Sequence, residues 1–263
     1  QEGNPSGMLA YNMTSVLYTL WLGFKPTSAI RNLSQHTLII GDIGPEYFGK
    51  GIGLRFTEEG RDAVNNHSLT WRGRKAAFVP GVDDSFVEGW SHTFREQALW
   101  MFRKADEQNV KDAFLGGYAE AKAILTEANN ALPADKKLSP EQLKEYWYER
   151  GDEVAADTQY LYTKMNSMAI SQSSGGRVIS VLTTWMANWM ELMVKWISKR
   201  PSQVYLKFEK STGATLPKKN WSNTYKAILL YAAIVGLAYI IKEKTRLRAF
   251  EYTGITSLRY LGA

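Results

Sequence analysis

The chain contains no cysteine among its 263 residues. Without thiols it can build neither a disulfide scaffold nor a thiolate zinc site, and it has no cysteine nucleophile. Histidine is also scarce: only His36, His67 and His92 occur, and none stands at a metal-binding spacing such as His-x-x-x-His. We expect each histidine to lie on the surface or to be satisfied in the core. The sequence therefore predicts no metal site and no cofactor.

Short motifs of common enzyme sites are also missing. The sequence has no Gly-x-Ser-x-Gly elbow and no nucleotide-binding fingerprint. The glycine-rich stretch 49–54 departs from the phosphate-binding pattern Gly-x-x-x-x-Gly-Lys-Ser/Thr. Carboxylates are plentiful, but we expect them mostly on charged helix faces. Examples are Glu141, Glu145, Glu149, Asp152 and Glu153. The sequence predicts no catalytic residue and favours a protein that is not an enzyme.

No segment shows the convincing period-two alternation of apolar and polar residues that marks a strand. We therefore predict an all-α fold, either bundle-like or an extended helical assembly with long loops. Near the N-terminus, a helix over Leu9–Leu22 and another from Ser28 to about Ile40 form a predicted αα-hairpin. The segment Gly41–Gly53 holds five glycines and one proline, which predicts a loop, and a short helix is expected from Thr57.

Further helices are predicted in the centre of the chain, from Ser85 to about Ala105 and over Asn109–Ala131. The clearest local signal is Ser139, followed by Pro140 and Gln142, which together form a capping box. The helix that it opens is expected to reach about residue 171 and to present a seam to another helix. The seam comprises Leu143, Trp147, Val154, Leu161, Met165 and Met168, with Arg150 and Thr158 at the remaining positions.

The C-terminal part is expected to hold two more long helices. One covers Arg177–Lys199 and ends at Pro201, and the other begins at Thr224 and reaches about Arg248. Between them, 211–223 is predicted to be a polar loop. We divide the chain into three regions: an N-terminal helical region with glycine-rich loops (1–135), long amphipathic and tryptophan-rich helices (136–200), and a basic region with an apolar helix (201–263).

The net charge of +6 is unevenly distributed along the chain. From residue 199 to the end, twelve Lys/Arg stand against three Asp/Glu, which is +9, whereas residues 1–198 carry twenty against twenty-three, which is −3. A basic end on a slightly acidic body suggests contact with an anionic surface, either lipid headgroups or nucleic acid, with a solubilising basic face as the alternative. The residues predicted to bind an anionic surface are Lys218, Lys219, Lys242, Lys244, Arg246 and Arg248.

The segment Ala227–Ile241, here called the apolar run, has fifteen residues without charge. As a helix it is about 22 Å long, which is short for a lone span of a hydrocarbon core of about 30 Å. Three interpretations stay open: burial inside a soluble bundle, a membrane-inserted or interfacial helix, and burial on oligomerisation. With the tryptophans before it, the run forms the predicted membrane or subunit interface. That interface comprises Trp185, Trp189, Trp196, Trp221, Ile228, Leu229, Ile234, Leu237 and Ile240.

Three segments together resemble a protein family. Ser28-Ala-Ile-Arg-Asn-Leu-Ser-Gln35 resembles a Ser-Ala-x-x-Asn-Leu-Ser/Thr-Gln segment of very large tailed-phage polyvalent and internal virion proteins. Further on, the segment 154–162 resembles an element of the same proteins that ends in Thr-Gln-x-x-Tyr. Gly176-Arg177 then opens an aromatic helix, as it does there, although tryptophan and methionine fill places that are usually phenylalanine in that family.

The resemblance implies a segment of a giant virion protein that is packaged in the capsid and ejected with the DNA. It implies a homo-oligomer that contacts other virion proteins, the host membrane or phage DNA without sequence specificity. The expected location is the virion interior and, after ejection, the host cell envelope. The chain opens with Gln1 rather than methionine, so we expect a piece of a longer protein. A soluble helical docking domain of a polyprotein is the alternative, and a lytic or peptidase domain is a third hypothesis.

Overall fold

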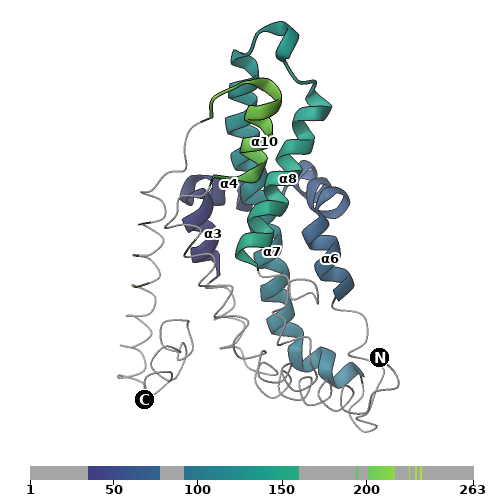
Figure 1. Ribbon diagram of the computed structural model, residues 1–263. Coiled ribbons are helices and arrows are strands. Elements are labelled where there is room, and N and C mark those ends of the chain that lie inside the picture. Colours follow the sequence, from purple (N-terminus) through teal and green to yellow (C-terminus); the bar gives the residue numbers. More distant parts are fainter. Residues whose placement is uncertain are drawn as a thin grey trace, which may run out of the picture.

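The computed structural model describes residues 35–77, 92–159 and 201–216, together with the single residues Val194, Tyr225, Leu229 and Ala232. Helices dominate these residues, and no strand occurs among them. The predicted all-α class is therefore confirmed (Figure 1). The helix predicted over Leu9–Leu22 and the tryptophan-rich helix lie outside the described residues, apart from Val194.

The centre of the molecule is a helical hairpin. Helix α7 (His92–Ala131) runs unbroken for 40 residues, and η2 (Ala134–Lys136) leads into α8 (Pro140–Thr158), which packs back along α7. The predicted division near residues 105–109 is wrong. This stretch contains neither glycine nor proline, and Asp106 and Asn109 are buried against neighbouring helices, so tertiary packing carries the helix through its polar residues.

The start of α8 is as predicted. Ser139 Oγ accepts a hydrogen bond from the Gln142 amide, and the Gln142 side chain accepts one from the Ser139 amide. The first half of the predicted seam is also confirmed, because Leu143, Trp147 and Val154 are buried in the core shared with α7. The seam positions Leu161, Met165 and Met168 lie outside the described residues.

The glycine-rich segment is helical, so the predicted loop over Gly41–Gly53 is wrong. Helix α3 (His36–Ile43) ends at Gly44, whose φ of 87° turns the chain, and α4 (Pro45–Leu54) starts at once with proline in its first turn. A Cβ atom built on Gly51 would lie 2.5 Å from the backbone nitrogen of Gly116 on α7. Here glycine permits helix-to-helix contact and does not break the helix.

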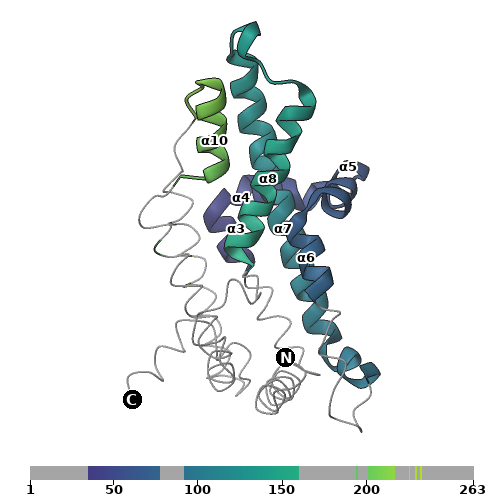
Figure 2. The same cartoon turned by 45° about the vertical axis from the view of Figure 1, so that its right-hand side comes forward.

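Three short elements connect α4 to α7. The predicted short helix is α5 (Glu58–Asp62), and Thr57 caps it by accepting a hydrogen bond from the Gly60 amide at 3.1 Å. A π-helical turn, η1 (Ala63–His67), and helix α6 (Leu69–Ala77) follow, and α6 packs on α7 and α8 (Figure 2).

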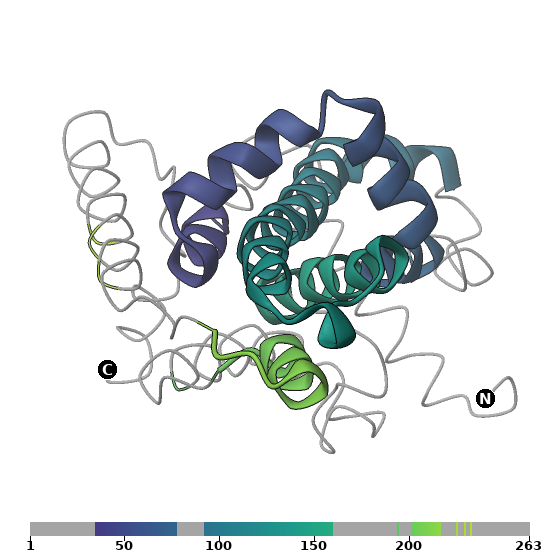
Figure 3. The same cartoon turned by 90° about the horizontal axis from the view of Figure 1, so that it is seen from above.

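A further helix, α10 (Gln203–Thr212), was not among the predicted elements, and its end overlaps the predicted polar loop. Ser202 caps its start, because the Ser202 hydroxyl accepts a hydrogen bond from the Tyr205 amide at 3.3 Å. Gly213, with a φ of 74°, closes its end in the left-handed conformation. Seen from above, α10 lies beside α8 on the outside of the hairpin, while α3 and α4 cover another side of α7 (Figure 3).

The core lies where α3, α4, α7, α8 and α10 meet. Phe114, Tyr118 and Leu125 of α7 pack with Trp147 of α8, and the rings of Tyr118 and Trp147 meet edge to face at 5.8 Å. The fully buried Phe208 brings α10 into the same cluster. This continuous apolar core fixes the positions of the charged groups that lie within it.

Candidate functional site

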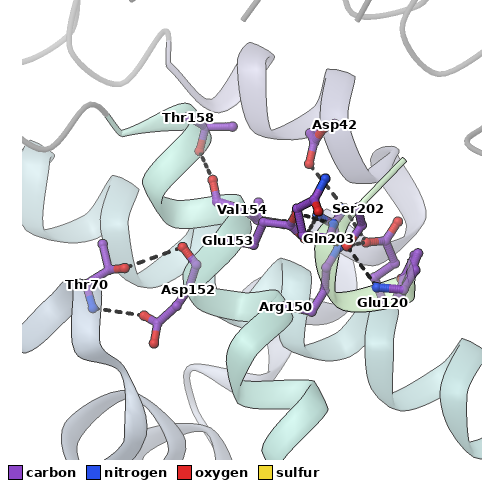
Figure 4. A network of polar contacts seen from close by, with 11 residues as sticks. Asp42, Thr70, Glu120, Arg150, Asp152, Glu153, Val154, Thr158, Ser202 and Gln203 are labelled. Carbon is purple, nitrogen blue, oxygen red and sulfur yellow. Dashed lines mark hydrogen bonds and ion pairs between the residues drawn. The ribbon is translucent and has the colours of Figure 1, made fainter. Parts of the chain in front are cut away.

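A buried ion cluster at the junction of α3, α7, α8 and α10 is the most concentrated set of charges in the described part of the chain (Figure 4). Arg150 of α8 stands at its centre with only 5% of its side chain exposed. Its Nη2 lies 2.7 Å from Glu120 Oε2 and 3.2 Å from Asp42 Oδ2, and its Nη1 donates to Glu153 Oε2 at 2.9 Å. We call Arg150, Asp42, Glu120 and Glu153 the Arg150 cluster.

Burial and mutual charge act against each other in the Arg150 cluster. Burial raises the pKa of Glu120, and the neighbouring Arg150 only partly offsets this. Burial by itself would lower the pKa of Arg150, but Glu120 and Asp42 outweigh it and hold that pKa above its ordinary value. The Arg150 guanidinium carbon lies 5.3 Å from the ring centroid of Tyr205 on α10. Burial raises the pKa of the Tyr205 hydroxyl. One cation thus faces three carboxyl groups.

Glu153 also holds the start of α10. Its Oε1 accepts a hydrogen bond from the Gln203 amide at 2.8 Å, and its Oε2 accepts one from the Ser202 hydroxyl. A carboxylate at a helix N-terminus satisfies free amides and is favoured by the helix dipole. The cluster therefore joins α10 to the body of the molecule.

Asp152, the residue before Glu153 on α8, does the same for α6. Its carboxylate accepts a hydrogen bond from the Thr70 amide at 2.9 Å (Figure 4). It also accepts hydrogen bonds from the Leu69 amide at 2.8 Å and from the Ser68 hydroxyl at 2.9 Å. Asp152 and Glu153 were expected on a charged helix face. Instead, each carboxylate caps the first turn of another helix, and no local pattern in the sequence marks a cap supplied from so far along the chain.

Two further ion pairs, each with a buried carboxylate of α7, fasten other segments to that helix. Arg74 of α6 meets Asp106 with Nε and Oδ2 3.0 Å apart, and its Nη2 donates to the Gln159 carbonyl at 2.6 Å. Asp112 accepts from Arg55 Nη1 at 3.1 Å and lies 3.2 Å from His36 Nε2. Each pair joins helices that are far apart in the sequence, and none opens onto a described cleft.

The histidines lie in ordinary structural surroundings where they are described. His36 stands beside Asp112, and His67 stacks on the Tyr148 ring at 4.1 Å between centroids. His92 begins α7, and its side chain lies outside the described part. Within residues 35–77, 92–159 and 201–216, no group of three His, Asp or Glu side chains is arranged to hold a metal ion.

A surface hollow lies between α4 and α7, with a volume of about 400 Å³. Leu54, Ala119 and Ala123 make it largely apolar, and its rim carries Lys50 and Lys122. These lysines pair with Glu46 and Glu59 respectively. The hollow thus brings together no acid, base and nucleophile of the kind that catalysis requires.

Of the predicted interface residues, the structure describes only Leu229. It is helical and half exposed, as is Tyr225 before it, and Ala232 is exposed on the same stretch. The other interface residues, and all of those predicted to bind an anionic surface, lie outside the described residues. They are Trp185, Trp189, Trp196, Trp221, Ile228, Ile234, Leu237 and Ile240, and Lys218, Lys219, Lys242, Lys244, Arg246 and Arg248.

Among the described helices, none combines the length and the apolar character that crossing a bilayer takes. Comparison of the chain with protein-family models, with curated proteins and with solved structures finds no match.

Proposed function

We propose that this chain is a non-catalytic helical assembly segment of a tailed-phage virion protein, oligomeric in its working form. Its C-terminal third contacts the host envelope during genome delivery. Two features support the class: buried charges that join helices to one another, and the sequence resemblance to internal virion proteins. The contact with the envelope has its own support in the apolar run.

The observation that carries the proposal is an exposed apolar face. Tyr225, Leu229 and Ala232 follow one another at spacings of four and three, so they share one face of a helix. Tyr225 is 60% exposed and Leu229 50% exposed. Burial of every residue of the apolar run within its own fold would leave neither Leu229 nor Ala232 exposed. A lipid surface or a sister subunit accounts for this face.

Charge favours lipid over a sister subunit as the first contact. The run is bounded by Lys226 and Lys242, and the chain from residue 199 carries +9. Lysines at the edges of an apolar helix place their ammonium groups among headgroup phosphates while their methylene stems stay in apolar surroundings. The same excess of cations gives the C-terminal end a salt-dependent attraction to DNA phosphates.

A vesicle flotation experiment with the whole chain tests the proposal. The wild-type protein is mixed with vesicles containing phosphatidylglycerol, and we expect it to float with them. We expect Leu229→Glu to reduce the floating fraction at least five-fold, because a charge on the apolar face must be desolvated on insertion. Leu69→Glu is the matched control: Leu69 is 66% exposed on α6, so the same change there should leave flotation intact.

A wild-type protein that remains in the dense fraction, and that stays monomeric without detergent, would favour the alternative, a soluble docking domain of a polyprotein. Equal loss with Leu229→Glu and Leu69→Glu would also contradict the proposal, because it would show that the apolar run has no special part in binding.

A further inference from the structure

The polar contacts between the exposed side of α10 and α8 form a single row. Gln203 meets Glu153, Lys207 meets Glu149, and Ser211 meets Tyr146. The positions rise by four along α10 while they fall by four and then three along α8. The two helices therefore run antiparallel, and these contacts define their register.

The polar row is close to solvent for most of its length. The side chains of Lys207 and Glu149 are 58% and 42% exposed, although their ion pair is 2.6 Å long. Exposed pairs of this kind contribute little to stability, because water screens the charges and two long side chains lose freedom. Only at the Glu153 end does the row enter the buried Arg150 cluster.

The apolar attachment of α10 is small. Val204 and Phe208 are buried on its inner face, and Leu216 is buried just beyond its end. Its outer face is open, with Leu206 41% exposed. Val204, Phe208 and the partly buried Tyr205, with Leu216 beyond the end, therefore hold a helix of ten residues in place. Each ordered residue opposes this with lost conformational entropy. The α7–α8 hairpin, by contrast, buries most of the core.

We propose that α10 is a latch: it opens as a unit while the α7–α8 hairpin stays folded, and its opening frees the C-terminal end of the chain from the body. Only eight residues separate Leu216 from Tyr225, where the exposed apolar face begins. Docked α10 therefore limits how far that face can move from the hairpin. We expect the release to let the exposed apolar face move toward a bilayer, and this purpose rests on the proposed function.

The Arg150 cluster gives this latch its closing contact. Glu153 is shared between the Arg150 guanidinium and the first turn of α10, so the carboxylate has its full set of partners only when α10 is docked. Tyr205 covers the guanidinium from the α10 side. When α10 opens, the Glu153 carboxylate and the Arg150 guanidinium become exposed to water. Water then replaces the hydrogen bonds that Glu153 made to α10, so the Arg150 cluster does not prevent release.

Hydrogen exchange of the full chain tests the latch. We expect the amides of α10 to exchange at least ten-fold faster than those of residues 110–125 of α7. Glu153→Gln should speed exchange in α10 about ten-fold more and leave residues 110–125 unchanged. Glu127→Gln, at an exposed position of α7, is the control and should change neither. Equal protection of α10 and α7, or equal acceleration of both by Glu153→Gln, would overturn the proposal.

The absence of cysteine allows a second test in the same protein. In the double variant Glu149→Cys/Lys207→Cys, a short bis-maleimide should close the latch and bring α10 exchange down to the α7 level, whereas capping each thiol separately should not. We expect the closed form to float with anionic vesicles at least five-fold less than the capped form. Equal flotation of both would refute any role of release. If neither floats, the proposed function fails, and exchange alone decides the latch.

Discussion

At the scale of single residues, the fold depends on glycines at helix-to-helix contacts, where any larger side chain would collide with the neighbouring helix. The backbones of α4 and α7 touch at Gly51, and those of α7 and α8 touch at Gly151, where an added Cβ would lie 2.7 Å from the Phe114 carbonyl oxygen. Such close approach brings whole helix faces into contact and buries the residues around it. Gly49, two residues before Gly51 on the same helix, has nothing within 4 Å of the same position.

This contrast predicts opposite effects of one substitution. Gly51→Ala should lower the free energy of unfolding by about 1–3 kcal/mol, because α4 must move away from α7. Gly49→Ala should raise it by roughly 0.5–1 kcal/mol, because alanine loses less conformational entropy in a helix. Urea unfolding followed by circular dichroism measures both. A similar small change in the two variants would mean that α4 does not touch α7 at Gly51.

At the scale of helices, the sequence predicts well wherever the signal is local. The capping box at Ser139 and the short helix from Thr57 were both predicted from neighbouring residues, and both are confirmed. The glycine-rich segment 41–53 was wrongly predicted to be a loop. Its Gly51 permits close contact with Gly116 of α7, which is distant in the sequence. Helix α10 is an exception, because it was not among the predicted helices although local signals, the Ser202 cap and Gly213, mark both its ends.

The candidate site shows the same limit. A charged stretch on an amphipathic helix predicts solvent exposure, yet Asp152 and Glu153 face the starts of two other helices. Arg150 is the instructive case, because its place in the apolar seam of α8 was visible in the sequence. An arginine in a buried seam requires carboxylate partners, which nothing in the sequence identified as Asp42 and Glu120.

The cap supplied by Asp152 predicts a local effect on α6. Asp152→Ala should lower the stability of the protein by about 1–2 kcal/mol, because the first amides of α6 lose their acceptor. Exchange of the Leu69 and Thr70 amides of α6 should accelerate more than exchange of the amides of α8. Glu145→Ala, at an exposed position on the same helix, should change neither quantity by much. Unchanged protection at Leu69 and Thr70 would show that Ser68 alone caps α6.

At the scale of the whole molecule, α7 is the spine to which the other helices are fastened by buried charge. Glu120, Asp112 and Asp106 stand on α7 and hold arginines from α8, from the residue after α4, and from α6 respectively. These contacts fix which helix lies where, because a misplaced helix would leave a charge buried without a partner. Among these carboxyl groups, Glu120 has a pKa that burial raises, so the stability of the molecule depends on its protonation.

Burial raises the pKa of Glu120 above its ordinary value of 4.5 despite the nearby Arg150. A carboxyl group with a higher pKa in the folded state binds its proton more tightly there. Its contribution to stability is therefore complete below pH 4.5 and is lost as the pH rises through the folded pKa. Glu120→Gln removes this dependence, so the unfolding free energy of the variant minus that of the wild type should increase between about pH 4 and pH 8.

Urea unfolding of the wild type and of Glu120→Gln across that pH range measures the difference in unfolding free energy. The test is the slope of this difference against pH, because a pH-independent effect of the glutamine amide does not change the slope. A slope of the opposite sign for Glu120→Gln would mean that attraction to Arg150 outweighs burial and lowers the pKa in the folded state. The Arg150 cluster would then hold three charged carboxylates around one cation, and the helices that supply them would be drawn together by ion pairing rather than held by the core.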